Sequence, residues 1–273
     1  MKTIKKMTAM LLAGVMAVSL VGCGGSENED VNLTVFAAAS MTETLEEIGN
    51  NYSKEHPNVK VTFNFDSSGT LKTQIEEGAE CDLFVSAAQK QMDELDITAD
   101  KSVNTVGLDK IDKDTRRDIL ENKVTLVVPA DNPKKIESYD DLISHLKAKD
   151  ILMAMGNEDV PVGQYTQKIL TFHGLDEKAL AADGLITYGS NVKEVTTQVS
   201  ESAADCGIIY STDAYSAGLN VVDTATEEMC GRVIYPAAVL KESKHAEEAK
   251  AFLDYLGTEE SKKVFEKVGF TCI

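Results

Sequence analysis

The sequence contains no tryptophan, 6% aromatic residues, and only three arginines, Arg116, Arg117 and Arg232. Pockets for organic ligands usually have apolar and aromatic walls, so this composition argues against such a ligand. The four histidines are scattered and the five cysteines form no CxxC pair, so no site for a metal cation is expected. Because arginine is scarce, a bound anion would be held mainly by uncharged groups.

Negative charge dominates the chain, with 45 acidic residues against 27 lysines and arginines and a formal net charge of −18. Nucleic-acid binding depends on cationic groups that neutralise phosphates, so nucleic acid is excluded as a partner. An anionic membrane surface attracts basic segments rather than acidic ones. Any membrane association is therefore expected through an anchor and not through the body of the protein.

The N-terminus has the pattern of an export signal. Lys2, Lys5 and Lys6 precede an uncharged run over residues 7–21, which is shorter than the about 20 residues of a spanning helix. Residues 1–22 are therefore interpreted as a signal peptide. The sequence Leu20-Val21-Gly22-Cys23 resembles a bacterial lipobox, which implies lipidation of Cys23. Residues 23–31 are then a polar linker between the lipid anchor and the folded body.

Four further cysteines are left without a definite role: Cys81, Cys206, Cys230 and Cys272. Disulfides are permitted outside the cytoplasm, and four cysteines allow three pairings. Cysteine can equally serve as a small buried hydrophobic residue, and the sequence leaves both states open.

After the linker, short apolar strands alternate with amphipathic helices. Such alternation predicts an α/β protein with largely parallel sheets. Strands are expected at residues 33–37, 59–65, 83–87, 123–129, 151–155, 185–188, 206–210, 219–222 and 232–240. Helices are expected at residues 41–53, 70–77, 89–95, 112–122, 162–172, 192–203, 245–256 and 258–268.

Five junctions between these elements contain groups that could bind an anion, at residues 35–40, 65–70, 159–165, 188–192 and 207–213. In open α/β sheets, ligands bind beyond the carboxyl ends of strands, where helices begin. A helix start leaves about four N–H groups unpaired and carries about half a positive charge, so several converging starts form an anion site. Serine and tyrosine hydroxyls add donors, and Lys193 is the one cationic side chain near these junctions.

A purely structural interpretation of the same residues is available. Ser40 and Glu43 have the spacing of a capping box, which stabilises a helix by ~1 kcal/mol without any ligand. Ser68 could also be a plain cap, and Tyr210 could be ordinary packing at a strand end. The functional interpretation therefore depends on the whole set of junctions and their order.

That order is familiar from a known family. The sequence reads VFAAAS at 35–40, VPVGQY at 160–165 and GIIYSTDA at 207–214, with further matching segments at 74–87, 235–239 and 269–271. Taken in this order, the segments resemble the substrate-binding proteins of molybdate ABC importers, over nearly all of the chain after the linker.

The resemblance implies a two-lobed α/β fold of the periplasmic-binding-protein type (type II), with mixed sheets flanked by helices and a ligand cleft between the lobes. Lobe 1 would comprise residues 32–122 and 232–273, and lobe 2 residues 123–231. By the same resemblance, an oxyanion would be bound by the hydroxyls of Ser40, Ser68 and Tyr210 and by the backbone N–H groups of Val162 and Val192. Three positions depart from the family pattern: Gly69 stands where serine is common, Val162 stands where alanine is common, and no acidic residue precedes Val192.

The resemblance also implies a function. The chain is expected to be an extracytoplasmic solute-binding protein that captures molybdate or tungstate and delivers it to the membrane permease of an ABC importer, acting as a monomer without a cofactor. Sulfate and phosphate are the alternative ligands. A site made only of donors disfavours an anion that carries its own hydrogen, but Asp66, if it faced inward, could accept a hydrogen bond from phosphate.

An enzyme is the main competing class. The sequence has no Gly-x-Ser-x-Gly elbow, and Ser190 and Lys193 match Ser-x-x-Lys without the companion Lys-Thr-Gly. The prediction is therefore a binding protein and not an enzyme.

Overall fold

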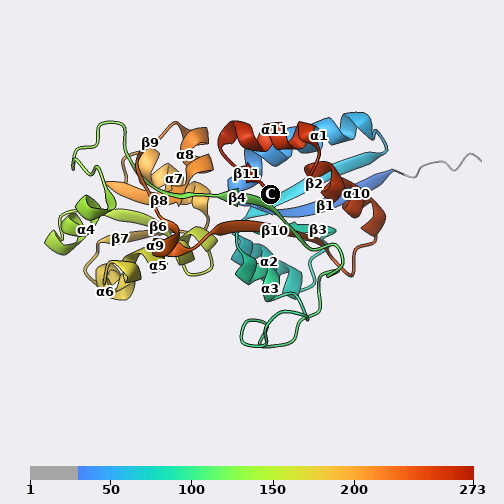
Figure 1. Ribbon diagram of the computed structural model, residues 1–273, viewed down its shortest axis with the longest axis horizontal. Coiled ribbons are helices and arrows are strands. Elements are labelled where there is room, and N and C mark those ends of the chain that lie inside the picture. The colour runs from blue at the N-terminus through green and yellow to red at the C-terminus, as the bar shows by residue number, and fades with distance from the viewer. Residues whose placement is uncertain (1–29) are drawn as a thin grey trace, which may run out of the picture.

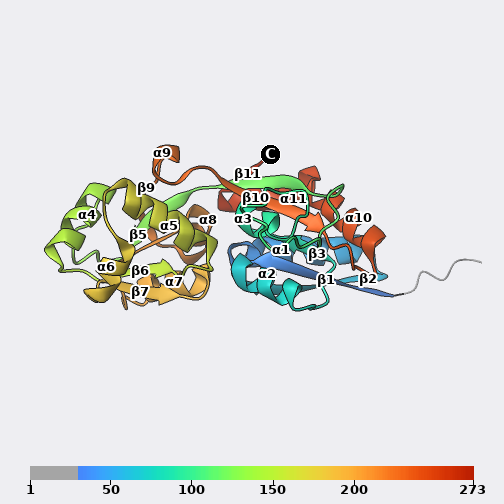
Figure 2. The ribbon, with the colours of Figure 1, turned by 90° about the horizontal axis from the view of Figure 1, so that it is seen from below.

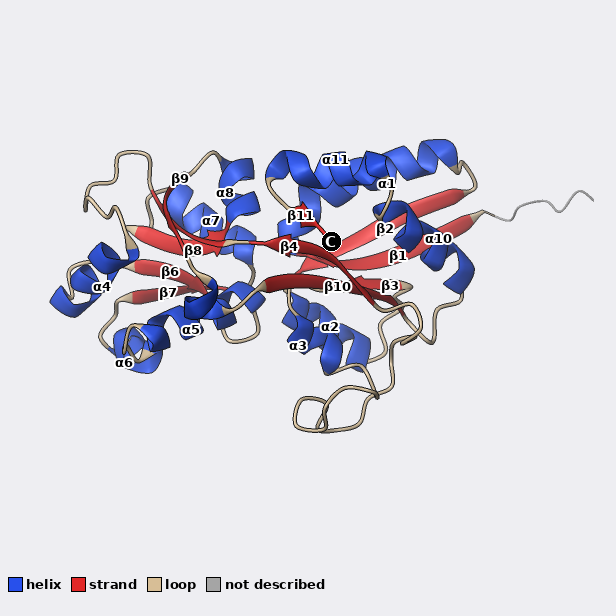
Figure 3. Cartoon of the chain, viewed as in Figure 1, coloured by secondary structure: helices blue, strands red, loops and turns tan. Residues whose placement is uncertain are grey.

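The protein consists of two α/β lobes that lie side by side (Figure 1), and a view turned by 90° shows the same separation (Figure 2). The computed structural model describes residues 30–273. The predicted signal peptide, Cys23 and nearly all of the linker lie outside the described residues. Each lobe contains one sheet with helices on both faces (Figure 3), so the predicted two-lobed α/β fold with mixed sheets is confirmed.

The sheet of lobe 1 has six strands in the order β11-β4-β10-β3-β1-β2. β1 runs parallel to β2 and β3, whereas β10 is antiparallel to β3 and β4. The elements of this lobe are β1 (Val31–Ala38), a short 3-10 helix (Ala39–Met41), α1 (Thr42–Glu55), β2 (Val59–Asp66), α2 (Ser68–Glu76), β3 (Leu83–Val85), α3 (Gln89–Asp93), β4 (Arg117–Asn122), β10 (Val233–Val239), α10 (Ala246–Leu256), α11 (Glu259–Val268) and β11 (Thr271–Cys272).

The sheet of lobe 2 has five strands in the order β7-β6-β8-β5-β9. β6 is parallel to β7 and β8, and β5 is antiparallel to β8 and β9. The elements of this lobe are β5 (Val124–Val128), α4 (Tyr139–Ala148), β6 (Met153–Gly156), α5 (Pro161–Phe172), α6 (Glu177–Ala182), β7 (Ile186–Gly189), α7 (Val192–Ser200), β8 (Cys206–Tyr210), α8 (Ser211–Ala217), β9 (Asn220–Thr224) and α9 (Glu227–Cys230).

Two chain crossings join the lobes. At the first, Lys123 alone separates β4, which ends at Asn122, from β5, which begins at Val124. At the second, the chain leaves β9 at Thr224 and passes through α9 before it enters β10 at Val233. The two crossings thus differ greatly in length.

Apolar side chains on both faces of the lobe 1 sheet explain its two helical layers. Neighbouring residues of a strand point to opposite faces, and in β1 Val35 joins the main core while Phe36 packs with Leu71 and Met92 in a second cluster. Leu71 belongs to α2 and Met92 belongs to α3. Helices must therefore cover both faces, as an α/β fold requires.

The sequence predicted a helix over residues 112–122, and this prediction was wrong. β4 occupies the second half of that segment and hydrogen-bonds to β10 on one side and β11 on the other. Side-chain burial in β4 alternates, since Leu120 and Asn122 are buried while Ile119 and Glu121 are partly exposed. The residue types favour a helix, but pairing with two strands from the far end of the chain overrides that preference.

The alternation of strands and helices alone predicted largely parallel sheets, and that prediction was wrong. The sheets are mixed, as the resemblance implied, because the strands at and after the crossings run antiparallel to their neighbours. The sequence interpretation also missed α4, α6, α8, α9 and β11. For α4 a local signal existed: Ser138 accepts the N–H of Asp141 as a helix cap, ahead of the buried Leu142 and Leu146.

Candidate functional site

A small pocket lies between the lobes, where strands of both sheets end and helices begin. Its volume is about 10 Å³, far less than the about 300–1,000 Å³ typical for drug-sized ligands. Among the residues that the structure describes, none that lines this pocket is a lysine or arginine. The lining includes all five predicted ligand residues, Ser40, Ser68, Val162, Val192 and Tyr210.

Ser68 presents its hydroxyl hydrogen to the pocket. Ser67, not Ser68, caps α2 by accepting the N–H of Thr70. The Ser68 side chain is fully buried, and its Oγ accepts the backbone N–H of Ala87 at 2.9 Å. A backbone N–H can only donate, so the hydrogen of the Ser68 hydroxyl remains free for a ligand.

Ser40 does not form the capping box that its spacing with Glu43 suggested. It lies in the 3-10 helix before α1, and the N-cap of α1 is Met41, which makes no side-chain cap. The buried Ser40 Oγ instead lies 2.9 Å from Oη of Tyr235 in β10. The sequence interpretation gave Tyr235 no role, because its partner lies far away along the chain.

Val162 belongs to the first turn of α5. Pro161 is the first residue of this helix, a position where its missing N–H costs nothing. The next amide, that of Val162, has no acceptor within residues 30–273. It is thus one of the unpaired N–H groups that the helix start offers to the pocket.

Val192 is the first residue of α7, whose N-cap Asn191 accepts the N–H of Glu194 at 3.1 Å. The Val192 N–H likewise has no acceptor in the described part of the chain. Asn191 also points its Nδ2 toward Oδ1 of Asp66 in the other lobe, at 3.4 Å. This contact gives a physical reason for the missing acidic residue before Val192, since a carboxylate there would repel Asp66.

Tyr210 ends β8 and is 2% exposed. Its hydroxyl is buried and makes no hydrogen bond to any described residue. Burial raises the pKa of Tyr210 well above its usual value, so the phenol keeps its hydrogen. A buried hydroxyl without a partner costs free energy, and here it belongs to a residue that lines the pocket.

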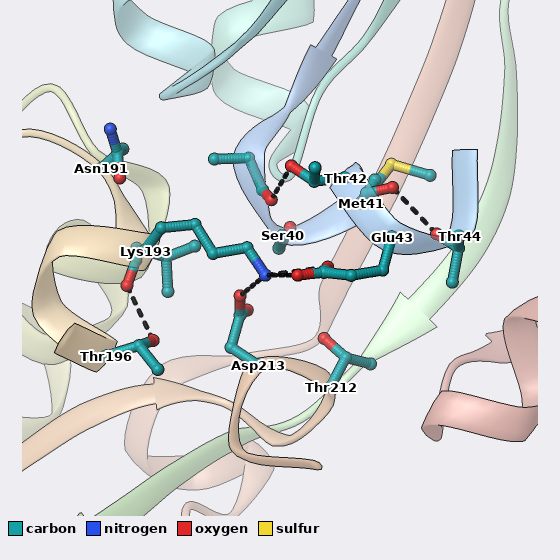
Figure 4. A network of polar contacts seen from close by, with 12 residues as sticks. Ser40, Met41, Thr42, Glu43, Thr44, Asn191, Lys193, Thr196, Thr212 and Asp213 are labelled. Atoms are coloured by element: carbon teal, nitrogen blue, oxygen red, sulfur yellow. Dashed lines mark hydrogen bonds and ion pairs between the residues drawn. The ribbon is translucent and has the colours of Figure 1, made fainter. Parts of the chain in front are cut away.

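Lys193 lies next to this site, between two carboxylates (Figure 4). Its Nζ is 2.7 Å from Oε1 of Glu43 in lobe 1 and 3.2 Å from Oδ1 of Asp213 in lobe 2. The second contact is an ion pair that is not aligned as a hydrogen bond, and neither oxygen of Asp213 has a hydrogen-bond donor within the described residues. Lys193 therefore adds no net positive charge to the site.

The pKa values of this group follow from its burial. Burial alone lowers the pKa of Lys193, but Asp213 and Glu43 more than offset this effect and raise it. Burial raises the pKa of Asp213 to about 6, and Lys193 only partly opposes the shift. The sequence interpretation missed this cluster because no local pattern connects α1, α7 and α8.

The two lobes touch closely at Gly69 in α2. A Cβ atom on Gly69 would lie 2.1 Å from the backbone oxygen of Asp159 in lobe 2, a distance that no side chain can occupy. Glycine at this position is therefore required for the lobes to approach as they do. The departure from the family pattern at Gly69 thus coincides with a close contact between the lobes.

Outside this site, the structure offers little chemistry. A larger hollow in lobe 1 contains Lys244 and Lys110, which are paired with Glu80 and Glu242 and leave no set of free donors. Cys81, Cys206, Cys230 and Cys272 are all free thiols. Within residues 30–273, no group of three or more potential metal ligands gathers, and no helix has the length and apolarity to cross a membrane.

Residues 33–271 match the model of the family described as bacterial extracellular solute-binding protein. The chain belongs to this family. This solute-binding protein is 36% identical to the "Putative ABC transporter substrate-binding lipoprotein YvgL" of Bacillus subtilis, over 97% of this chain and 98% of the relative. It is 34% identical to the molybdate-binding protein ModA of Haemophilus influenzae, over 99% and 98% of the two chains.

A solved structure shares the fold of this solute-binding protein. The periplasmic molybdate-binding protein of Azotobacter vinelandii aligns with a TM-score of 0.72 and 20% identity, over 88% of this chain and 98% of that chain. The predicted family is confirmed by these comparisons, as are an extracytoplasmic role and a binding protein rather than an enzyme.

Proposed function

We propose that this protein captures molybdate or tungstate outside the cytoplasm and delivers it to the membrane permease of an ABC importer. One observation carries the proposal. Three hydroxyls and two helix-start amides line a single small pocket, and four of these five groups, Ser68, Tyr210 and the amides of Val162 and Val192, have a hydrogen that no described residue accepts. The identity to a ModA protein over nearly the whole chain supports molybdate as the ion.

Uncharged donors are sufficient to bind a doubly charged ion. A hydrogen bond to a charged group contributes about 1.5–3 kcal/mol, and the low dielectric of a closed cleft strengthens it. Helix starts add about half a positive charge each. The α5 and α7 starts both line the pocket, so the dianion meets positive potential there although the chain as a whole is acidic.

The donor set also predicts selectivity. A fully ionised dianion can accept every hydrogen bond, whereas hydrogen phosphate carries a hydrogen that needs an acceptor. Of the described residues, Asp66 is the one acidic residue that lines the pocket. Its Oδ1 already accepts the Ser67 N–H at 2.7 Å and faces Asn191, so we assign Asp66 to holding the cleft rather than to the ligand.

We further propose that the mature protein is a monomer held at the membrane by lipidated Cys23, as the lipobox-like sequence predicts. A Cys23→Ala variant is expected to appear in the soluble fraction of the cell envelope. Continued membrane association of that variant would contradict the anchor without affecting the binding proposal.

Calorimetric titration tests the ligand. We expect a dissociation constant of about 1 μM or below for molybdate and tungstate, at least about 100-fold weaker binding of sulfate, and no binding of phosphate. Sulfate binding as tight as that of molybdate would favour the alternative ligand. Tight phosphate binding would show that Asp66 acts as an acceptor.

A further inference from the structure

The direction of one hydrogen bond decides whether Ser40 can bind an anion. The Ser40 and Tyr235 hydroxyl oxygens are 2.9 Å apart, and by distance alone either could donate. If Ser40 donates to Tyr235, it presents lone pairs to the pocket and repels an anion. If Tyr235 donates, the hydrogen of Ser40 is free for the ligand.

The side-chain amide of Asn122 determines this direction. The backbone N–H of Lys123 lies 2.8 Å from one terminal atom of the amide, which must be the oxygen because an N–H can only donate. The other terminal atom is therefore nitrogen. It lies 3.2 Å from Oη of Tyr235 and 2.9 Å from Oγ1 of Thr212, so each of its two hydrogens has an acceptor.

Tyr235 therefore accepts from Asn122, and its own hydrogen must go elsewhere. Within the described residues, Ser40 is the one hydrogen-bond partner of this hydroxyl besides Asn122. Tyr235 is fully buried, and burial raises the pKa of its phenol well above the usual value, so the hydrogen stays in place. Leaving it unused would cost free energy, whereas the Ser40 hydrogen has the pocket to face.

We propose that Asn122 and Tyr235 are positioning residues that hold Ser40 as a hydrogen-bond donor to the oxyanion. Asn122 accepts a hydrogen bond from the Lys123 N–H and donates one to Tyr235. Tyr235 in turn donates to Ser40, which leaves the Ser40 hydroxyl to donate to the ligand. The inference rests on the proposed function of the pocket. The Ser68 hydroxyl is held as a donor more directly, because its oxygen accepts a hydrogen bond from the Ala87 N–H.

A double-mutant cycle tests the proposal. Molybdate affinity is measured by calorimetry for the wild type, Tyr235→Phe, Ser40→Ala and the double variant. We expect Tyr235→Phe to weaken binding about tenfold, the size of one hydrogen bond that is no longer oriented, and to have no further effect when the Ser40 hydroxyl is already absent. A merely structural role of Tyr235 would weaken binding by the same factor in both backgrounds, and that result would overturn the proposal.

Asn122→Asp provides a second test that does not depend on the Tyr235 variant folding. A carboxylate oxygen in place of Nδ2 accepts from Tyr235 and reverses the chain, so that Ser40 presents lone pairs. We expect the loss of affinity to exceed that of Tyr235→Phe and to shrink when combined with Ser40→Ala, which retains the added charge but removes the reversed hydroxyl. An equal loss with and without Ser40 would assign the effect to charge alone and overturn the proposal.

Tyr139→Phe is the matched control. Tyr139 is buried in lobe 2 with a hydroxyl that has no partner among described residues, and it does not line the pocket. The molybdate affinity of Tyr139→Phe is expected to equal that of the wild type. If the wild-type protein binds none of the four oxyanions, the proposed function fails first, whereas tight wild-type binding with an additive cycle contradicts only the positioning role.

Discussion

The two lobes supply the pocket in different ways. In lobe 1, the hydroxyl oxygens of Ser40 and Ser68 each accept a hydrogen bond from the protein, so the hydroxyl hydrogen of each is left for the ligand. In lobe 2, three contributing groups have no hydrogen-bond partner among residues 30–273: the Tyr210 hydroxyl and the amides of Val162 and Val192. The two serine hydroxyls of lobe 1 are thus oriented before the ligand arrives, whereas the groups of lobe 2 gain their hydrogen bonds from the ligand.

Buried carboxylates show the same contrast. Asp96 in lobe 1 accepts hydrogen bonds from Thr98 and Arg116, which outweigh burial and lower its pKa. Within the described part of the chain, Asp213 in lobe 2 has only the ion pair with Lys193, and burial raises its pKa. Among the described residues, most of the buried side-chain atoms without a hydrogen-bond partner belong to lobe 2, including those of Tyr210 and Asp213.

Closure itself is the feature with the largest expected effect. Gly69→Ala places a Cβ against the Asp159 backbone, and only separation of the lobes can relieve that contact. We expect molybdate affinity to fall more than about 100-fold, since the lobe 2 donors then no longer reach the ion. Calorimetry measures the affinity, and small-angle scattering measures whether the lobes stay apart.

Gly257→Ala is the control for this substitution. Gly257 follows α10, outside the pocket, and its φ of −88° suits any residue. Its affinity should match that of the wild type. Normal affinity and normal closure in Gly69→Ala would show that the lobes do not meet at this point.

The contrast between the buried carboxylates predicts opposite stability effects. The folded pKa of Asp213 lies above its ordinary value of 3.8, so the native state binds more protons than the unfolded chain between about pH 4 and 6. The contribution of this group to stability is therefore lost as the pH rises through that range. At pH 7, Asp213→Asn should stabilise the protein by on the order of 2 kcal/mol and raise Tm by about 5 °C, with the gain vanishing near pH 4.

Asp96→Asn should destabilise the protein at pH 7. The lowered pKa of Asp96 means that its stabilising effect is present above the unfolded pKa and is lost as the pH falls through the folded value. This variant should lower Tm at pH 7, and less so in acid. Thermal unfolding of both variants at pH 4 and 7 measures the pair, and a fall in Tm for Asp213→Asn at pH 7 would break the contrast between the lobes.

The smallest expected effects distinguish side-chain donors from backbone donors. Ser68→Ala removes a hydroxyl that donates to a charged ligand, so affinity should fall about 10- to 100-fold. Val162→Ala retains the N–H and should change affinity less than about threefold. Titration of the two variants under one set of conditions measures the difference, and a similar loss in both would show that the Val162 side chain matters.

The sequence predicted the α/β layers because short apolar runs such as residues 124–128 and 206–210 favour buried strands, and all their residues are buried. The two lobes were predicted from the family resemblance. The sequence pattern failed at β4, whose identity depends on β10 and β11 as neighbours and not on its own residues. The strand-to-helix junctions indicated where a site could form, and the resemblance supplied the five ligand residues, which line one pocket. Asn122, Tyr235 and Asp213 could not be found in this way, since each acts through a partner on a distant element.

The first crossing has a further consequence for how the protein works in repeated cycles. Asn122, Tyr235 and Ser40 all belong to elements of lobe 1, on one side of the single residue that separates β4 from β5. A rotation of lobe 2 about that residue leaves these three in place, although it changes the contacts of Asn122 with Thr212 and Ser211. In the open form, the Ser40 hydroxyl is therefore already oriented toward the incoming ion. Capture does not have to wait for this hydroxyl to reorient.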